Sequence, residues 1–302
     1  MNNFIYALAD GICIGAIYAL IALGYTMVYG IIKLINFAHG EFFMIGAYAG
    51  LGAYVLLPPG IGLWLALPLV LLVAGLAGAA IAVVAERLAY RPIRGRGRLT
   101  ALLTAIGVSF FLQNIMTFVR DGDTQSFGGA VQALAEQQIA LPGNLLFQSV
   151  KLAFIGIALG LMALLWYITR RTRLGRAMRA TSQDLEAARL MGINVDRVIM
   201  CTFALGGFLA GVAGVLLGAK NNVEPFMGFM PGLIAFVAAV VGGIGSIPGA
   251  VAGGLVIGLL QQLVVWAGVP SGYMNVVTFL LLIVVLVVRP QGLLGRVQRE
   301  KV

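Results

Sequence analysis

The sequence predicts an all-α integral membrane protein that crosses the bilayer eight or nine times, with some helices discontinuous. Hydrophobic residues make up 61% of the 302 residues and charged residues only 10%, which is more apolar surface than a soluble domain of this length needs. Apolar runs of about 20 residues recur along the chain, and each is long enough to cross a bilayer as a helix. The distribution of basic residues is a third indication.

Basic residues gather on three short connectors between apolar runs. Five arginines lie in 87–98, seven in 170–197, and three arginines with Lys301 in 289–301, which together are 16 of the 20 basic residues. Because positively charged loops stay inside, these connectors and the C-terminus are expected in the cytoplasm. The placement of the net charge of +9 therefore argues against a nucleic-acid partner.

The apolar runs predict the order of the spans. The candidates are Phe4–Tyr29, Phe42–Leu57, Ile61–Ala85, Leu99–Val119, Val150–Thr169, Val198–Gly218, Gly232–Ile247, Ala250–Ala267 and Met274–Val288. Three spans precede the first basic connector, which places the N-terminus outside unless 31–57 also folds back on itself. The first run lacks a basic start and a cleavage site, so it is expected to be a retained span and not a signal peptide. If 232–267 is a re-entrant pair, eight spans remain.

A short polar helix is predicted inside the second basic connector, 170–197. Thr181 followed by Asp184 fits a capping box, and Gly192 with Asn194 fits a helix end, so the helix is expected over 182–191, about three turns. Two roles suit such a helix on the cytoplasmic side. It docks onto another protein, or it lies along anionic lipid headgroups.

The segment 30–41 breaks the apolar pattern and carries Asn36, His39 and Glu41 beside hydrophobic helices. Ionisable groups at membrane depth are costly and tend to face a cavity or a partner. His39 and Glu41 are two residues apart, so they suit a turn or a helix start. Glu41 would then interact with the positive end of the helix that follows. Besides that structural role, a place on the substrate path and proton coupling by the pair remain open.

A second break is rich in glycine and contains Gly242, Gly243, Gly245 and Pro248. Discontinuous helices occur in membranes where protein or a wet cavity satisfies the backbone. A hinge or gate is therefore as well supported as a simple turn between helices. Small-xxx-small patterns such as Gly207-xxx-Gly211 and Gly249-xxx-Gly253 predict close helix packing, with a sliding gate surface as the alternative.

Several kinds of chemistry are missing from the sequence. The single histidine excludes a multi-histidine metal site, and Cys13 and Cys201 form no CxxC motif, so no metal is expected. No phosphate-binding P-loop motif occurs, so the chain does not itself hold ATP. No span carries paired acidic residues of the kind used by proton- or sodium-coupled carriers. These absences indicate a pathway protein that takes its energy from elsewhere, and not an enzyme.

Several segments resemble the LivH-type permease subunits of bacterial branched-chain amino acid ABC transporters. The first two are Tyr18–Gly30 and Ile35-Asn36-Phe37-Ala38-His39-Gly40-Glu41. They are followed by Glu86–Pro92, Gly107–Asn114, Gly192–Val198, Gly242–Gly249 and Gly292–Arg296. The similar segments follow one another in order from about residue 11 to 297. The predicted external loop, 120–149, is the part that resembles the family least.

The resemblance implies a single permease domain, 1–302, in the bacterial inner membrane. It would import leucine, isoleucine or valine together with a homologous second permease, two cytoplasmic ATP-binding subunits and a periplasmic binding protein, and it would need no cofactor of its own. The connector 170–197 would be the coupling loop, with Asp184, Leu185, Glu186, Ala187 and Gly192 contacting an ATPase. The candidates for the substrate pathway are Asn36, His39, Glu41 and Asn114.

The alternative from a different class is a solo facilitator or channel for small polar solutes, which would work without ATPases. An intramembrane enzyme is disfavoured, because His39 has no matched acid and nucleophile. The predicted external connectors, 120–149 and 220–224, are expected to be solvated loops.

Overall fold

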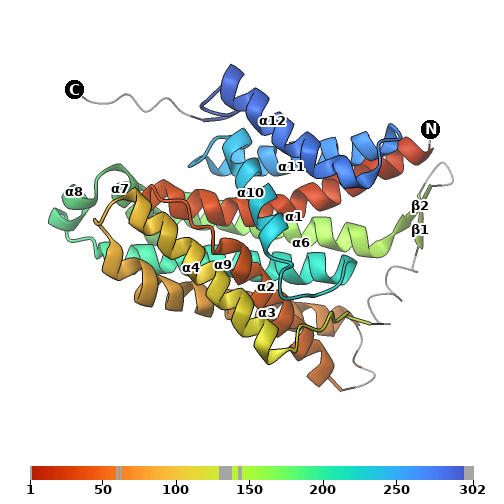
Figure 1. Cartoon of the computed structure of the whole chain (residues 1–302), viewed down its shortest axis with the longest axis horizontal. Helices are drawn as coiled ribbons and strands as arrows, with labels where there is room; N and C mark the ends of the chain where they lie inside the picture. The colour runs from red at the N-terminus through yellow and green to blue at the C-terminus, as the bar shows by residue number, and fades with distance from the viewer. Residues whose placement is uncertain (1, 59–60, 62, 129–137, 142–144, 296–302) are drawn as a thin grey trace.

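A computed structural model describes residues 2–58, 61, 63–128, 138–141 and 145–295 (Figure 1). Each of the nine predicted spans corresponds to a helix, which confirms the fold class. These helices are α1 (Asn2–Ile32), α2 (His39–Leu56), α3 (Leu63–Ala85), α4 (Arg98–Val119), α6 (Ser149–Arg171), α9 (Val195–Lys220), α10 (Phe229–Gly242), α11 (Ile247–Trp266) and α12 (Met274–Val288). Seven of these nine helices are long and apolar enough to cross a membrane. The remaining two are α2, with 18 residues, and α10, with 14.

Shorter elements lie at the two ends of the bundle. A π-helical turn, η1 (Glu86–Tyr90), and a 3-10 turn, η2 (Arg91–Ile93), continue α3, while α7 (Arg173–Gln183) and α8 (Leu185–Leu190) follow α6. Strands β1 (Gln138–Leu141) and β2 (Leu145–Gln148) form an antiparallel hairpin. The turn η3 (Ser271–Tyr273) precedes α12. We call the end that carries 86–97, 170–194 and 289–295 the basic end; the N-terminus and the hairpin lie at the opposite end (Figure 1).

The centre of the bundle is formed by α1 and α9. About two thirds of their most apolar stretches are buried within the chain, 67% for α1 and 72% for α9, against 6% for α12. Residues Ile17–Leu23 of α1 are almost completely enclosed. The outer faces of α3, α4 and α12 instead expose leucine, valine and phenylalanine side chains, as expected for surfaces that meet lipid or another subunit.

Glycines bring the central helices into backbone contact. A Cβ added to Gly15 of α1 would lie 2.9 Å from the carbonyl oxygen of Gly254 in α11. Gly78 of α3 and Gly211 of α9 face each other in the same way, with 3.1 Å between an added Cβ and the Gly211 Cα. Helices this close gain dispersion contacts that larger side chains would prevent. The structure therefore favours packing as the role of these glycines.

The glycine-rich break separates α10 from α11 at a sharp turn. The predicted span Gly232–Ile247 was wrong at its end, because α10 stops at Gly242 and Ile247 is already the first residue of α11. Gly243 and Gly245 have φ angles of 107° and 90°, which other residues rarely adopt. Ser246 then caps α11 by accepting a hydrogen bond from the Gly249 N–H at 3.2 Å.

Candidate functional site

The polar helix in the second basic connector is shorter than predicted and begins at a different residue. Thr181 is not its N-cap: it lies within α7, is buried, and donates a hydrogen bond to the Ala177 carbonyl at 2.8 Å. Asp184 is the cap, because its backbone is extended and its Oδ1 accepts from the N–H groups of Glu186 and Ala187 at 2.8 and 3.0 Å. The predicted helix 182–191 is therefore two helices, α7 and α8, that meet at Asp184.

The end of α8 is formed as predicted at Gly192. This residue has a φ of 79°, and its N–H donates to the Arg189 carbonyl while the Ile193 N–H donates to the Ala188 carbonyl, both at 3.0 Å. This pattern is a Schellman motif, which ends helices at a left-handed glycine. Asn194 has another role than predicted, because its side chain caps the start of α9 by accepting from the Arg197 N–H at 3.0 Å.

One face of α8 is held by the bundle and the rest is exposed. Ala188 is buried, whereas Asp184, Leu185, Glu186 and Ala187 are all exposed. At the end of the helix, Leu190 and Met191 are 89% and 82% exposed. Large apolar side chains are rarely presented so fully in an otherwise polar connector, and such a patch is typical of a protein or membrane contact.

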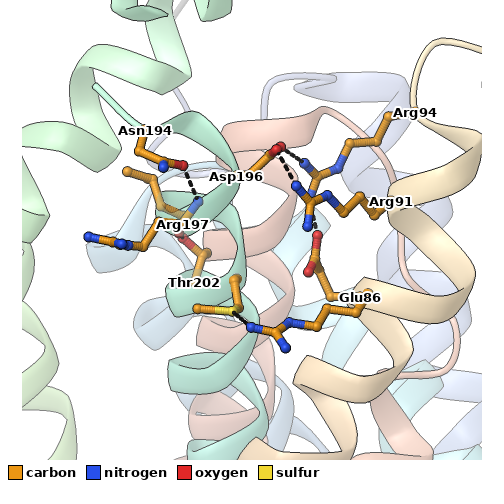
Figure 2. A network of polar contacts seen from close by, with 10 residues as sticks. Glu86, Arg91, Arg94, Asn194, Asp196, Arg197 and Thr202 are labelled. Atoms are coloured by element: carbon orange, nitrogen blue, oxygen red, sulfur yellow. Dashed lines mark hydrogen bonds and ion pairs between the residues drawn. The ribbon is translucent and has the colours of Figure 1, made fainter. Parts of the chain in front are cut away.

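Beside α8, an ion-pair network joins the end of α3 to the start of α9 (Figure 2). Asp196, in the first turn of α9, accepts from Arg91 through Oδ2 and from Arg94 through Oδ1, both at 2.7 Å. Arg94 also pairs with Glu86, whose side chain is only 2% exposed. Because one guanidinium contacts both carboxylates, η1, η2 and α9 share a single charged cluster.

A cavity of about 170 Å³ lies next to this network. It is lined by Glu86, Arg87, Arg91, Asn194, Asp196, Arg197 and Met200. The Arg87 guanidinium donates to the Met200 sulfur at 3.2 Å. In the part of the chain that the structure describes, no three histidine, cysteine or acidic side chains come together in a group that could hold a metal ion.

Sequence reasoning did not identify this network. The sequence assigns the arginines of 87–98 to the positive-inside pattern and Glu86–Pro92 and Gly192–Val198 to the family resemblance, but neither reading pairs Asp196 with an arginine. A signal was present: Glu86 and Asp196 each lie at the end of a span beside arginines, and acidic residues at such positions need partners. The pairing itself joins Asp196 to an arginine 105 positions away, so the fold was needed to find it.

Asn36 lies between the start of α2 and the end of α3. Its Oδ1 accepts a hydrogen bond from the Ala38 N–H at 3.1 Å and another from the Tyr90 hydroxyl at 2.5 Å. The side chain is 4% exposed, and its Nδ2 has no hydrogen-bond partner. Asn36 thus links η1 to the turn that precedes α2.

His39 and Glu41 occupy the first turn of α2, as the sequence predicted, and both are buried. The His39 imidazole hydrogen-bonds to the backbone of Ile21 and packs edge-on against Tyr25, with 4.8 Å between ring centroids. Its Nε2 fills the space beside Gly24 that a Cβ would need, and it has no hydrogen-bond partner. Among the described residues, His39 and Glu41 form no hydrogen bond or ion pair with each other.

Glu41 connects α2 to α4. Its Oε1 accepts from the Ser109 hydroxyl at 2.9 Å and from the Gln113 amide at 2.7 Å, whereas Oε2 is buried without a partner. Oε2 lies near Gly228, where α10 begins; a Cβ added to Gly228 would be 3.1 Å away. The N-terminal ends of α2 and α10 therefore meet around this carboxylate, inside the bundle.

Asn114 is not brought to the other three candidates. It is exposed on α4, and its Nδ2 donates to the Phe110 carbonyl in the same helix at 2.7 Å. It shares α4 with Ser109 and Gln113, which contact Glu41, but both of these are buried whereas Asn114 faces outward.

The proposed gate residues Gly242, Gly243, Gly245 and Pro248 lie around the α10–α11 turn. The chain after α12 closes over this turn: the Leu293 N–H donates to the Val241 carbonyl at 2.8 Å, and the Leu294 N–H donates to the Gly242 carbonyl at 2.9 Å. Pro248 lies in the first turn of α11, where its missing N–H costs nothing. These contacts favour a braced turn, and a hinge role stays a prediction.

Comparison with known proteins gives full-length similarities. A family model described as "Branched-chain amino acid transport system / permease component" matches residues 7–286. The high-affinity branched-chain amino acid transport system permease protein LivH of Escherichia coli (strain K12) is 45% identical, over 99% of this chain and 98% of its own length. The corresponding protein BraD of Pseudomonas aeruginosa is 43% identical with the same coverage. A probable LivH of Methanocaldococcus jannaschii is 28% identical over 91% of this chain and 88% of its own.

Proposed function

This chain belongs to the permease component family of branched-chain amino acid transport systems, and on that premise we propose that it forms half the translocation pathway of an ATP-driven importer for leucine, isoleucine and valine. The other half is a homologous second permease. Two ATP-binding subunits supply the energy, and a periplasmic binding protein delivers the substrate. The chain itself catalyses no reaction and needs no cofactor, since ATP is held by its partners.

The proposal places the protein in the bacterial inner membrane as a multi-pass subunit. The basic end faces the cytoplasm, together with the C-terminus, because positively charged connectors stay inside and the three connectors of the sequence carry 16 of its 20 basic residues. The N-terminus and the hairpin then face the periplasm. This orientation puts α8 on the side where ATP is available.

The observation that carries the proposal is the geometry of α8. The backbone groups at both ends of this short helix are hydrogen-bonded, by the Asp184 side chain at its start and by the Gly192 turn at its end. The helix therefore holds its shape without a partner. It nevertheless exposes Leu190 and Met191. A preformed helix with an exposed apolar tip fits a groove on another protein, and we assign Asp184, Leu185, Glu186, Ala187 and Gly192 to the ATPase contact.

We further propose that Asn36, His39, Glu41 and Asn114 line or adjoin the substrate path. The support for the first three is that each has a buried polar atom without a hydrogen-bond partner. A branched-chain amino acid carries an ammonium and a carboxylate, and such orphaned groups are where a charged substrate end finds hydrogen bonds. Asn114 is included because it exposes an amide on an apolar helix, on an outer face that meets lipid or another subunit.

The test of the ATPase contact uses two variants of α8. Leu190→Glu and Glu186→Lys leave the capping residues unchanged, so α8 should keep its fold while its contact surface changes. We expect the ATP-binding subunits to be lost on purification, or ATP hydrolysis to continue without uptake. Leu190→Met keeps the apolar tip and serves as the matched control, with wild-type assembly and uptake.

Two results would contradict the proposal. Wild-type assembly and coupling in both variants would remove α8 from the contact. Uptake by the permease reconstituted without ATP-binding subunits, and unaffected by ATP depletion, would indicate the solo facilitator instead.

A further inference from the structure

The ion-pair network at the basic end joins the start of α9, which follows α8 in the chain, to η1, whose Tyr90 contacts Asn36 ahead of α2. We infer that Asp196, Arg94, Glu86 and Tyr90 form the joint through which the position of α8 sets the position of the α2 start. This inference rests on the proposed function, since it requires a partner that moves α8. None of these four residues contacts substrate; they are positioning residues.

The first step of the joint is the short link between α8 and α9. The Schellman motif ties the Gly192 turn back onto α8, and the Asn194 side chain caps α9 directly afterwards. The turn between the two helices is therefore hydrogen-bonded at both ends. A displacement of α8 reaches the first turn of α9, where Asp196 lies, without a loose linker to absorb it.

The second step crosses from α9 to the end of α3. Arg91 and Asp196 are 52% and 40% exposed, so solvent screens that pair and it contributes little. The Arg94–Glu86 pair is different, because Glu86 is 2% exposed and Arg94 22%. A buried carboxylate that loses its partner is strongly disfavoured, so Arg94 must stay with Glu86. Arg94 also holds Asp196, and motion of α9 is thereby passed to η1 (Figure 2).

The third step runs from η1 to α2. Glu86 and Tyr90 are the first and last residues of the same π-helical turn. The Tyr90 hydroxyl donates to Asn36, which precedes His39 and Glu41 by a single turn. The Tyr90 ring also packs against Phe203 of α9, with 5.5 Å between centroids, so η1 is held from both sides. The route thus ends at the orphaned polar atoms of α2.

The experiment compares two conservative variants in the complex reconstituted with its ATP-binding subunits and binding protein. Asp196→Asn removes the charge that ties Arg94 to α9, and Tyr90→Phe removes only the hydroxyl bound to Asn36. Substitutions along a coupling route alter coupling about 2- to 30-fold, so we expect transport per ATP hydrolysed to fall by that factor in each. In the double variant the loss should be less than the product of the two single losses, because both interrupt one route.

The opposite end of the bundle offers a matched control. Lys151 and Asp10 form an ion pair of 2.6 Å between α6 and α1, partly buried like the network but remote from α8. Asp10→Asn should leave transport per ATP unchanged. An equal loss in this control, or none in Asp196→Asn and Tyr90→Phe, would overturn the inference.

Measurements on the wild-type complex separate failure of the proposed function from failure of the joint. If the wild type does not couple ATP hydrolysis to uptake, the proposed function itself fails. If the wild type couples but Asp196→Asn does not assemble, Tyr90→Phe decides the matter, since it retains the aromatic packing. Unchanged coupling in that variant would then refute the joint.

Discussion

Gly24 lies opposite His39 where α1 passes the start of α2, and the imidazole occupies the space that a side chain at position 24 would need. The histidine is completely enclosed and cannot move outward. Two features that the sequence presents separately, a glycine within an apolar span and a lone histidine, are thus one packing arrangement. The absence of a side chain at position 24 leaves the space that the His39 ring needs.

We predict that Gly24→Ala destabilises the protein by about 1–3 kcal/mol, since a methyl group must displace a fully packed ring. Thermal unfolding of the purified permease measures the change. Gly107→Ala, at an exposed helix position with open space around it, is the control and should be neutral or slightly stabilising. Gly24→Ala combined with His39→Ala should recover part of the loss; no recovery would mean that the ring is not the obstacle.

At the scale of elements, α8 depends on its cap more than on its own length. A helix of six residues is too short to be stable alone, so the two hydrogen bonds from Asp184 matter. Loss of such a cap costs about 1 kcal/mol, which raises the open fraction about fivefold.

Accordingly, Asp184→Ala should make tryptic cleavage after Arg189 about fivefold faster in the isolated permease, at a protease level where opening is in rapid equilibrium. Asp184→Asn preserves the cap and should be cut at the wild-type rate. Equal rates in all three proteins would show that packing of Ala188, and not the cap, holds α8 in place.

Hydropathy alone located the nine apolar helices, since lipid requires each to satisfy its own backbone. It could not decide where α7 ends, because Thr181 and Asp184 are both good caps and only the fold shows which one leaves the helix. The same limit applies to the site. The spacing of His39 and Glu41 indicated a turn or a helix start. Ser109 and Gln113 were not expected as partners of Glu41, and Tyr90 was not expected beside Asn36. Those contacts are set by how α2, α3 and α4 pack, which no local pattern encodes.

For the whole molecule, the proposed orientation predicts that one end of the bundle is accessible to reagents from the periplasm and the other from the cytoplasm. Asp123 follows the far end of α4, a helix that starts next to the basic end, whereas Gln183 lies within the basic-end segment 170–194; both residues are exposed. In a background with Cys201→Ser, a membrane-impermeant maleimide should label Asp123→Cys in intact spheroplasts. Gln183→Cys should be labelled only after permeabilisation. The reverse pattern would invert the proposed orientation. Cys13 is buried and should not contribute.

The close contact between α1 and α11 has a consequence for biosynthesis. The glycine face of the first helix, at Gly15, meets Gly254 of a helix that is inserted near the end of translation. Until then α1 packs only against helices made earlier, such as α9, and the face that meets α11 stays open, because contacts so distant in sequence form late. This face of α1 is therefore covered only when α11 arrives. Chains that stall earlier would display that face to lipid, where quality-control proteases could recognise them.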